Sequence, residues 1–284
     1  MVVVVIWGAS WPAGHLVATN IPPITAAFLR FTIALPFFFI TAYFYDHDIK
    51  IPRNLHPKLA ILGIMQVTIY NICFLTGLTY TSSSDAVLII ACNPTFTAII
   101  ASKLYEDERF TKNKIIGLIT ALLGVIIVVE LSPNTDVPNR LLGNIIILCG
   151  AFTWASFTAF SRPIVRQMKP MTFTAWAALY GWLALMIISP VNGTWFVHTK
   201  KEIWFALIYL ALAASVFGNI LYNSGVRKLG SSRTSIFVNF VPIFGILSSL
   251  IILPDEKFSW WYIVSLFMIL SGVTLVNKKP KLKS

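Results

Sequence analysis

Long apolar runs separated by short polar breaks dominate the chain. Each run is close to the length of about 20 mostly apolar residues that a helix needs to cross a bilayer. The breaks collect charges, prolines and glycines, which end helices. The pattern therefore predicts ten membrane-spanning helices and an all-α integral membrane fold. The expected helices cover residues 2–19, 24–45, 58–79, 83–104, 112–130, 141–162, 171–190, 203–226, 231–253 and 258–277.

One stretch of the chain occurs twice, 148 residues apart. A Ser-rich turn opens an apolar helix that meets Pro94 in the first copy and Pro242 in the second. Further matches at this offset are Asn71/Asn219, Gly77/Gly225, Ser83/Ser231, Glu108/Glu256 and Gly124/Gly272. A repeat this long indicates two copies of one folding unit. We expect five-helix units at 1–131 and 140–278, with a basic cytoplasmic tail at 279–284.

The loop charges predict how these units sit in the membrane. Of the 22 Lys and Arg residues, 17 fall on one side of the predicted topology and 4 on the other, with Arg30 inside a helix. Basic loops stay in the cytoplasm, so both termini are expected there, in a cell membrane protein. Five helices per unit is an odd number, so the second unit must be inverted. Inverted repeats are typical of transporters, whose halves can exchange conformations.

Composition excludes several function classes. The chain is 57% hydrophobic and 12% charged, with a mean hydropathy of +0.77, whereas soluble domains carry roughly 25% charged residues. The net charge of +11 is explained by membrane-flanking loops, so no nucleic-acid partner is expected. The three cysteines lie in apolar runs without nearby histidines, which predicts no metal site and no cofactor. The first run lacks a basic flank and a cleavage site and is interpreted as a retained helix.

Several motifs resemble one transporter family. They are Ile6-Trp7-Gly8-Ala9-Ser10-Trp11, Pro22-Pro23, Ala27-Phe28-Leu29-Arg30-Phe31, Asn93-Pro94, Glu106-Asp107-Glu108, Trp154-Ala155-Ser156, Pro242 and Glu256. The chain resembles the ten-helix permeases of the drug/metabolite transporter superfamily, EamA type, over nearly its whole length. The resemblance implies a central cavity lined by helices 2–19, 58–79, 83–104, 141–162, 203–226 and 231–253. It leaves the substrate open among amino acids, other metabolites, nucleotide-like compounds and drugs.

One departure from the superfamily bears on mechanism. Four-helix relatives use a glutamate in their first helix for proton-coupled cation export, and here helix 2–19 holds no acid. All eleven acids lie in loops or at helix ends. This argues against a carboxylate-based proton/cation antiport.

Polar side chains at membrane depth are costly and are therefore candidates for substrate binding. Tryptophan rings at that depth are candidates for stacking on a planar or cationic substrate. Trp7, Trp11 and His15 share one helix face, as do Gln66 and Tyr70. Their alternative roles are interfacial anchoring and hydrogen bonding between helices. The candidate cavity residues are Trp7, Trp11, His15, Gln66, Tyr70, Asn71, Asn93, Trp154, Asn219, Tyr222, Asn223 and Asn239.

Other residues are expected to be structural. Arg30 is expected to pair with an acid or with backbone carbonyls, and Asp85 to cap a helix start. Pro94 and Pro242 mark helix breaks, and Gly77 and Gly225 recur as repeat-related small residues. A strip of small residues on helix 112–130, at Gly117, Ala121 and Gly124, indicates close helix packing and offers a homodimer surface.

These observations predict a membrane transporter of small organic metabolites, working by alternating access. The exported solutes are expected to be amino acids or similar neutral or zwitterionic compounds, because no acid is embedded among the aromatic side chains. The alternatives are efflux of drugs or nucleotide-type metabolites by the same fold, a pore, and a membrane enzyme acting on lipid. An enzyme would need a nucleophile with its base or a metal cluster, and no catalytic residue is predicted. The expected partners are a small-molecule substrate and the lipid bilayer.

Overall fold

The computed structural model describes residues 1–106, 111–131, 139–192, 197–229 and 238–277, and these residues form helices and connections without a strand. The α-helices are α1 Val2–Ala18, α2 Pro23–Asp46, α3 His56–Gly63, α4 Tyr70–Tyr80, α5 Ser83–Ile90, α6 Asn93–Leu104, α7 Lys112–Leu131, α8 Arg140–Val165, α9 Pro170–Asn192, α10 Lys201–Ile208, α11 Gly218–Leu229, α13 Val241–Ile252 and α14 Trp260–Asn277. A 3-10 turn, η1, covers Arg53–Leu55. Two π-helical segments, η2 Ile64–Ile69 and η3 Tyr209–Phe217, join α3 to α4 and α10 to α11.

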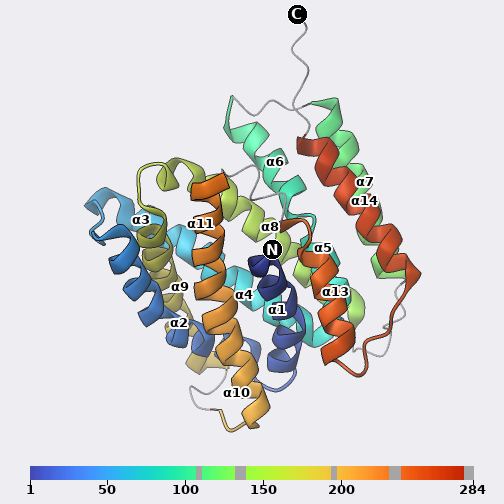
Figure 1. The fold of residues 1–284 in the computed structure, drawn as a ribbon, viewed down its shortest axis with the longest axis horizontal. Helices are drawn as coiled ribbons and strands as arrows, with labels where there is room; N and C mark the ends of the chain where they lie inside the picture. Colours follow the sequence, from blue (N-terminus) through green and yellow to red (C-terminus); the bar gives the residue numbers. More distant parts are fainter. Residues whose placement is uncertain (107–110, 132–138, 193–196, 230–237, 278–284) are drawn as a thin grey trace, which may run out of the picture.

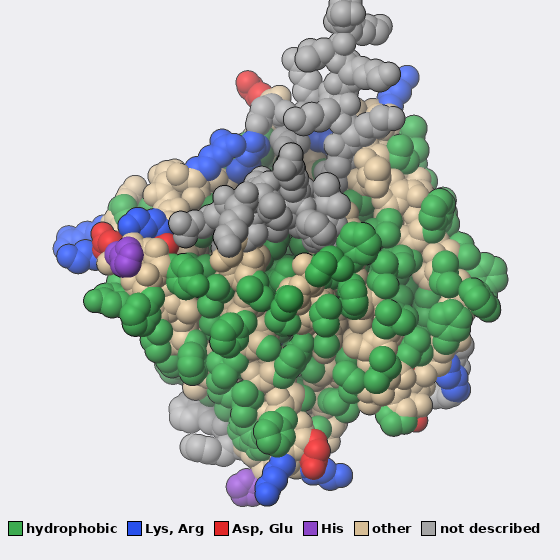
Figure 2. Space-filling view, in the orientation of Figure 1, with side chains coloured by type: hydrophobic (Ala, Val, Ile, Leu, Met, Phe, Trp, Pro, Cys, Tyr) green, Lys and Arg blue, Asp and Glu red, His purple; other side chains and the backbone are tan. Residues whose placement is uncertain are grey.

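The helices are built for a lipid environment. Within the described residues, seven helical stretches are long and apolar enough to cross a membrane, and Val2–Ala18, Val241–Ile252 and Trp260–Val276 are shorter apolar helices. Large apolar side chains such as Phe205 and Phe267 are more than two-thirds exposed. Figure 2 shows them as a broad hydrophobic band, with Lys and Arg gathered toward its margins. Lipid solvates such a band, whereas a monomeric soluble protein exposes only small apolar patches.

Two of the expected helices are broken at proline. α5 ends at Ile90, Ala91 and Cys92 form a turn, and α6 begins at Asn93 with Pro94 in its first turn. α13 likewise begins at Val241 with Pro242 in its first turn. Proline has no N–H to donate and fits the start of a helix, which suits Pro94 and Pro242 to the starts of α6 and α13. Breaks of this kind expose backbone groups inside the bundle. Other prolines, such as Pro12 in α1 and Pro36 in α2, lie inside continuous helices.

The π-helical segments were not predicted from the sequence, and they occupy repeat-related positions. Adding 148 to residues 64–69 gives 212–217, which lies within η3. Nearby side chains bond to carbonyls of these segments. Asn71 Nδ2 donates to the carbonyl of Val67 at 2.9 Å, and Asn219 Nδ2 donates to that of Ser215 at 2.6 Å. Such irregular turns inside helices are rare and frequently lie at functional sites.

The small-residue strip packs within the chain. α7 lies alongside α14, as Figure 1 shows at the right of the view. A Cβ added to Gly117 would stand 2.5 Å from the carbonyl oxygen of Gly272, and Ser265 Oγ donates to the carbonyl of Gly124 at 2.7 Å. The strip is therefore occupied by α14. A homodimer stays a prediction and would need another surface.

Candidate functional site

Four aromatic rings from three helices form a continuous column near the centre of the bundle. Trp11 of α1 meets Phe74 of α4 edge-on, with ring centroids 5.0 Å apart. Phe74 stacks on Tyr70 at 6.2 Å, and Tyr70 meets Trp154 of α8 at 4.8 Å. These separations are typical of attractive aromatic pairs. We call Trp11, Phe74, Tyr70 and Trp154 the aromatic column.

A second aromatic pair continues one turn further along α1. Trp7 Nε1 donates to the carbonyl of Ala214 in η3 at 3.0 Å, and its ring lies 5.5 Å from that of Tyr222 in α11. A Cβ added to Gly218 would stand 2.3 Å from Trp7 Nε1, so only glycine leaves room for the indole. The indole N–H is therefore engaged, and Trp7 offers its ring face rather than a donor.

Arg30 differs from its sequence interpretation. It projects from the first half of α2, and among the described residues it bonds to neither an acid nor a backbone carbonyl. Its Nη1 donates to Asn71 Oδ1 at 3.0 Å, and Nε and Nη2 donate to Ser215 Oγ at 3.1 and 3.0 Å. The guanidinium carbon lies 5.9 Å from the centroid of the Phe74 ring. A cation with neutral partners is thus held beside the aromatic column.

The other candidates are spread around this centre. Asn71 is buried and bonded, while Gln66 and Asn239 are partly buried with no side-chain bond among the described residues. His15 Nδ1 and Asn93 Oδ1 are buried without a partner in the described part of the chain. A Cβ on Gly77 would overlap Ile147 of α8 at 2.5 Å. The backbone of Asn223 and Gly225 lies in α11, and the side chain of Asn223 falls outside the described residues.

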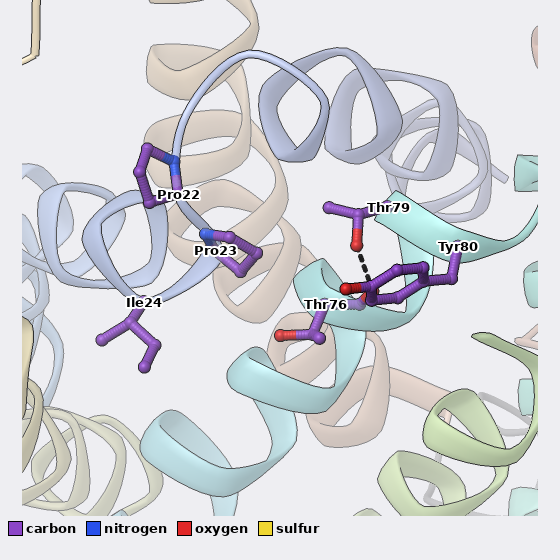
Figure 3. Close-up of a pocket in the computed structure, with 6 residues that line it drawn as sticks. All are labelled: Pro22, Pro23, Ile24, Thr76, Thr79 and Tyr80. Carbon is purple, nitrogen blue, oxygen red and sulfur yellow. Dashed lines mark hydrogen bonds between the residues drawn. The ribbon is translucent and has the colours of Figure 1, made fainter. Parts of the chain in front are cut away.

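A pocket of about 410 Å³ opens elsewhere, at the ends of α2 and α4. Figure 3 shows Pro22, Pro23 and Ile24 on one side of it and Thr76, Thr79 and Tyr80 on the other. None of the candidate residues lines it, and its walls carry no charged side chain. In the described part of the chain, no group of three His, Cys, Asp or Glu side chains is placed to bind a metal ion.

The start of α5 is tied to distant parts of the chain by two carboxylates. Ser82 Oγ, not the Asp85 side chain, is the cap, accepting from Asp85 N at 3.1 Å. The fully buried Asp85 carboxylate forms an ion pair with Arg140 at the start of α8, with Nε 2.7 Å from Oδ2. Glu256, between α13 and α14, accepts from the backbone N–H of Ser83 at 2.7 Å. The sequence interpretation of Asp85 as a capping residue is corrected by these contacts.

Replacing Glu256 should separate the effect of its charge from that of its oxygen. Burial raises the pKa of the Glu256 carboxyl above its usual range. The folded state therefore binds a proton more tightly than the unfolded state, and stability falls as pH rises through the interval between the two pKa values. Glu256→Gln should remove this dependence and keep the acceptor. Glu256→Ala should cost about 1–3 kcal/mol, because buried N–H groups lose their partner.

Thermal unfolding of the purified protein in detergent at acid and neutral pH measures both effects. The Gln variant should melt no lower than the parent at neutral pH, and the Ala variant should melt lower at both. Equal melting of the Gln and Ala variants would show that the acceptor oxygen contributes nothing.

Three residues of these sites escaped the sequence analysis. Phe74 is one of 21 phenylalanines and carries no polar signal. Ser215 lies in an apolar run, and its only clue is its place four residues before Asn219. Arg140 is one of the four basic residues on the less basic side of the predicted topology. Each gains its role from a partner on another helix, which no local pattern reveals.

Comparison with known proteins agrees with this architecture. The profile of the EamA-like transporter family matches residues 1–130 and 141–278, so the chain belongs to that family, within the drug/metabolite transporter superfamily. It is 28% identical over 244 residues to the uncharacterized transporter YyaM of Bacillus subtilis, covering 83% of this chain and 79% of YyaM. It is 24% identical to a probable amino-acid metabolite efflux pump of Escherichia coli, covering 96% and 91% of the two chains.

A solved structure shares the fold. One crystal structure superposes with a TM-score of 0.68 over 97% of this chain and 94% of its own, at 16% sequence identity. At this low identity, the likeness shows a shared fold and says nothing about function. Together with the membrane-spanning helices, the family membership makes this chain a multi-pass membrane transporter.

Proposed function

We propose that this transporter exports amino acids or similar neutral or zwitterionic solutes. The observation that carries the proposal is the aromatic column beside Arg30, Asn71 and Ser215, where apolar ring faces and hydrogen-bonding groups meet inside the bundle. A solute with an apolar part and a polar end matches both surfaces. A similar relative named as a probable amino-acid metabolite efflux pump supports this substrate class.

We propose further that transport proceeds by alternating access between two inverted five-helix repeats, which together make ten spanning helices. The contacts of α7 with α14 support this arrangement. Gly117 packs on Gly272 and Gly124 on Ser265, and the offset of 148 converts Gly117 to Ser265 and Gly124 to Gly272. The two contacts are therefore exchanged by the repeat, as a two-fold axis requires. The pairing is also antiparallel, which inversion demands.

The same correspondence extends to the aromatic residues. Trp7 contacts Gly218, and Trp154, its counterpart 147 residues later, contacts Tyr70, the counterpart of Gly218. The binding region then lies where equivalent parts of the two units meet, as in other transporters built from repeats. The charge asymmetry of the loops supports cytoplasmic termini in a cell membrane.

Counterflow in proteoliposomes tests the proposed function. Vesicles holding the purified chain and preloaded with unlabelled L-phenylalanine should accumulate external labelled L-phenylalanine saturably. Tyr70→Ala should weaken apparent binding by about 1–3 kcal/mol, because the ring sits within the column. Phe160→Ala is the matched control, since Phe160 is 45% exposed on the outside of the bundle.

A competition panel decides the substrate class. Amino acids should compete, while nucleosides, sugars and quaternary amines should not. Competition by quaternary amines or nucleosides alone would favour drug or nucleotide-type efflux. Flux without saturation would indicate a pore, and the absence of flux with every solute would contradict transport by this chain.

A further inference from the structure

Arg30 is a cation whose partners within the described residues are all neutral. The ion pair found in this part of the chain joins Asp85 to Arg140, not to Arg30. The acid on the same helix, Asp46, is 16 residues away, about 24 Å along the axis. Its carboxylate already accepts from the backbone N–H and the hydroxyl of Thr172. A charge inside a membrane bundle is costly unless an opposite charge reaches it.

The guanidinium also has donors to spare. It carries five N–H groups, and three bonds to Asn71 and Ser215 use three of them. Two N–H groups, both on the terminal nitrogens, have no partner in the described part of the chain. Two is the number that a carboxylate accepts in a paired contact with arginine.

The partners of Arg30 are themselves oriented by the π-helical segments. Asn71 Nδ2 donates to the carbonyls of Val67 and Gln66, which turns Oδ1 toward Arg30. Ser215 Oγ donates to the carbonyl of Leu210, five residues back within η3, which leaves its lone pairs for Arg30. Through Asn71 and Ser215, the two π-helical segments therefore position the guanidinium of Arg30. Because π-helical turns are rare and frequently lie at functional sites, this arrangement points to a ligand.

The aromatic column places apolar rings beside the same cation. The guanidinium carbon is 5.9 Å from the Phe74 ring, and Phe74 touches both Trp11 and Tyr70. A solute whose carboxylate meets Arg30 would lay an apolar side chain on these rings. We propose that Arg30 binds the carboxylate of the transported solute, which makes the substrate class monocarboxylic compounds with an apolar or aromatic side chain. This proposal rests on the transport function proposed above.

The first test compares a carboxylate with its amide. The purified full-length protein in detergent is titrated calorimetrically with L-phenylalanine, with L-phenylalaninamide and with inorganic phosphate. The ring and the amino group are shared by the first two probes, so a difference reports the carboxylate. We expect the acid to bind at least about tenfold more tightly than the amide, as a charge-assisted pair implies. Equal binding, failure of the acid to bind, or preference for phosphate would overturn the proposal.

Variants assign the effect to Arg30. Arg30→Gln should lower the affinity for L-phenylalanine at least about tenfold and leave that for the amide unchanged, so that the preference disappears. Ser215→Ala, which removes one hydrogen-bond partner of the guanidinium, should lower the affinity for L-phenylalanine by a smaller factor. An acid preference that persists in Arg30→Gln would overturn the assignment. If Arg30→Gln does not fold, Ser215→Ala decides: a smaller preference for the acid supports the assignment, and an unchanged preference overturns it.

Counterflow measurements distinguish failure of the proposed transport function from failure of the proposed carboxylate site at Arg30. Saturable exchange of a solute without a carboxylate, unchanged in Arg30→Gln, would leave the transport function standing and remove the carboxylate site. The absence of saturable exchange with every solute would remove the transport function. An acid preference in binding, together with exchange that Arg30→Gln abolishes, supports both.

Discussion

Arg140→Ala should destabilise the protein by about 3–5 kcal/mol, the usual cost of breaking a buried ion pair by removing one of its two charges. Asp85 is fully buried, and its carboxylate receives the Arg140 guanidinium at 2.7 Å. Tyr262 OH donates to the other carboxylate oxygen at 3.4 Å, but a neutral hydroxyl does not replace the charge of the guanidinium. The measurement is the midpoint of thermal unfolding in detergent micelles, followed by helical circular dichroism.

The double variant identifies the cause. Removing the Asp85 charge as well, in Asp85→Ala/Arg140→Ala, should restore much of the lost stability, because no orphaned charge remains. Lys200→Ala is the control for loss of a loop cation. A double variant whose loss equals the sum of the two single losses would show that the two residues act independently.

Gly272→Leu should cost about 3 kcal/mol, toward the upper end of what overpacking usually costs. A Cβ at this position would stand 2.4 Å from the carbonyl oxygen of Gly117 and 2.8 Å from the backbone nitrogen of Ala121. Backbone atoms cannot rotate aside, so α7 and α14 would have to separate along their contact. We expect a lower unfolding midpoint and a smaller yield of monodisperse protein on size exclusion.

Thr274→Leu is the matched control on the same helix. Thr274 is exposed, so the same leucine side chain there meets lipid rather than backbone. Its unfolding midpoint should stay close to that of the parent. Equal losses in the two variants would mean that α14 does not depend on its contact with α7.

The start of α5 also connects residues of the two predicted five-helix units. Asp85 and Ser83 belong to the first predicted unit, and Arg140, Ser249 and Glu256 to the second. Ser83 Oγ lies 2.8 Å from Ser249 Oγ, beside the Glu256 contact. Polar groups therefore join the two units at this end of the bundle. Counterflow with the Arg140 and Glu256 variants would therefore also test whether contacts between the two predicted units matter for transport.

The sequence by itself determined which stretches of the chain form long apolar helices. Lipid cannot hydrogen-bond a backbone, so each crossing segment must be a helix of mostly apolar residues. A run of apolar residues is visible in the local sequence without knowledge of the fold. The predicted stretch 24–45 became α2, Pro23–Asp46, and 112–130 became α7, Lys112–Leu131. Proline chemistry is also local, and the starts of α6 and α13 followed from it. The shared faces of Trp7 with Trp11 came from helical periodicity.

Only the tertiary structure decided what these side chains contact. Arg30 meets Ser215, 185 residues away, and Trp7 meets Ala214, 207 residues away. The π-helical segments have no sequence signal of their own, because a single extra residue per turn leaves the apolar composition unchanged. Asp85 looked like a cap because a helix start explains an acid locally, yet its buried carboxylate required a cation from another helix. Burial depends on how the helices pack, so the need of the Asp85 carboxylate for a cation could not be predicted from the local sequence.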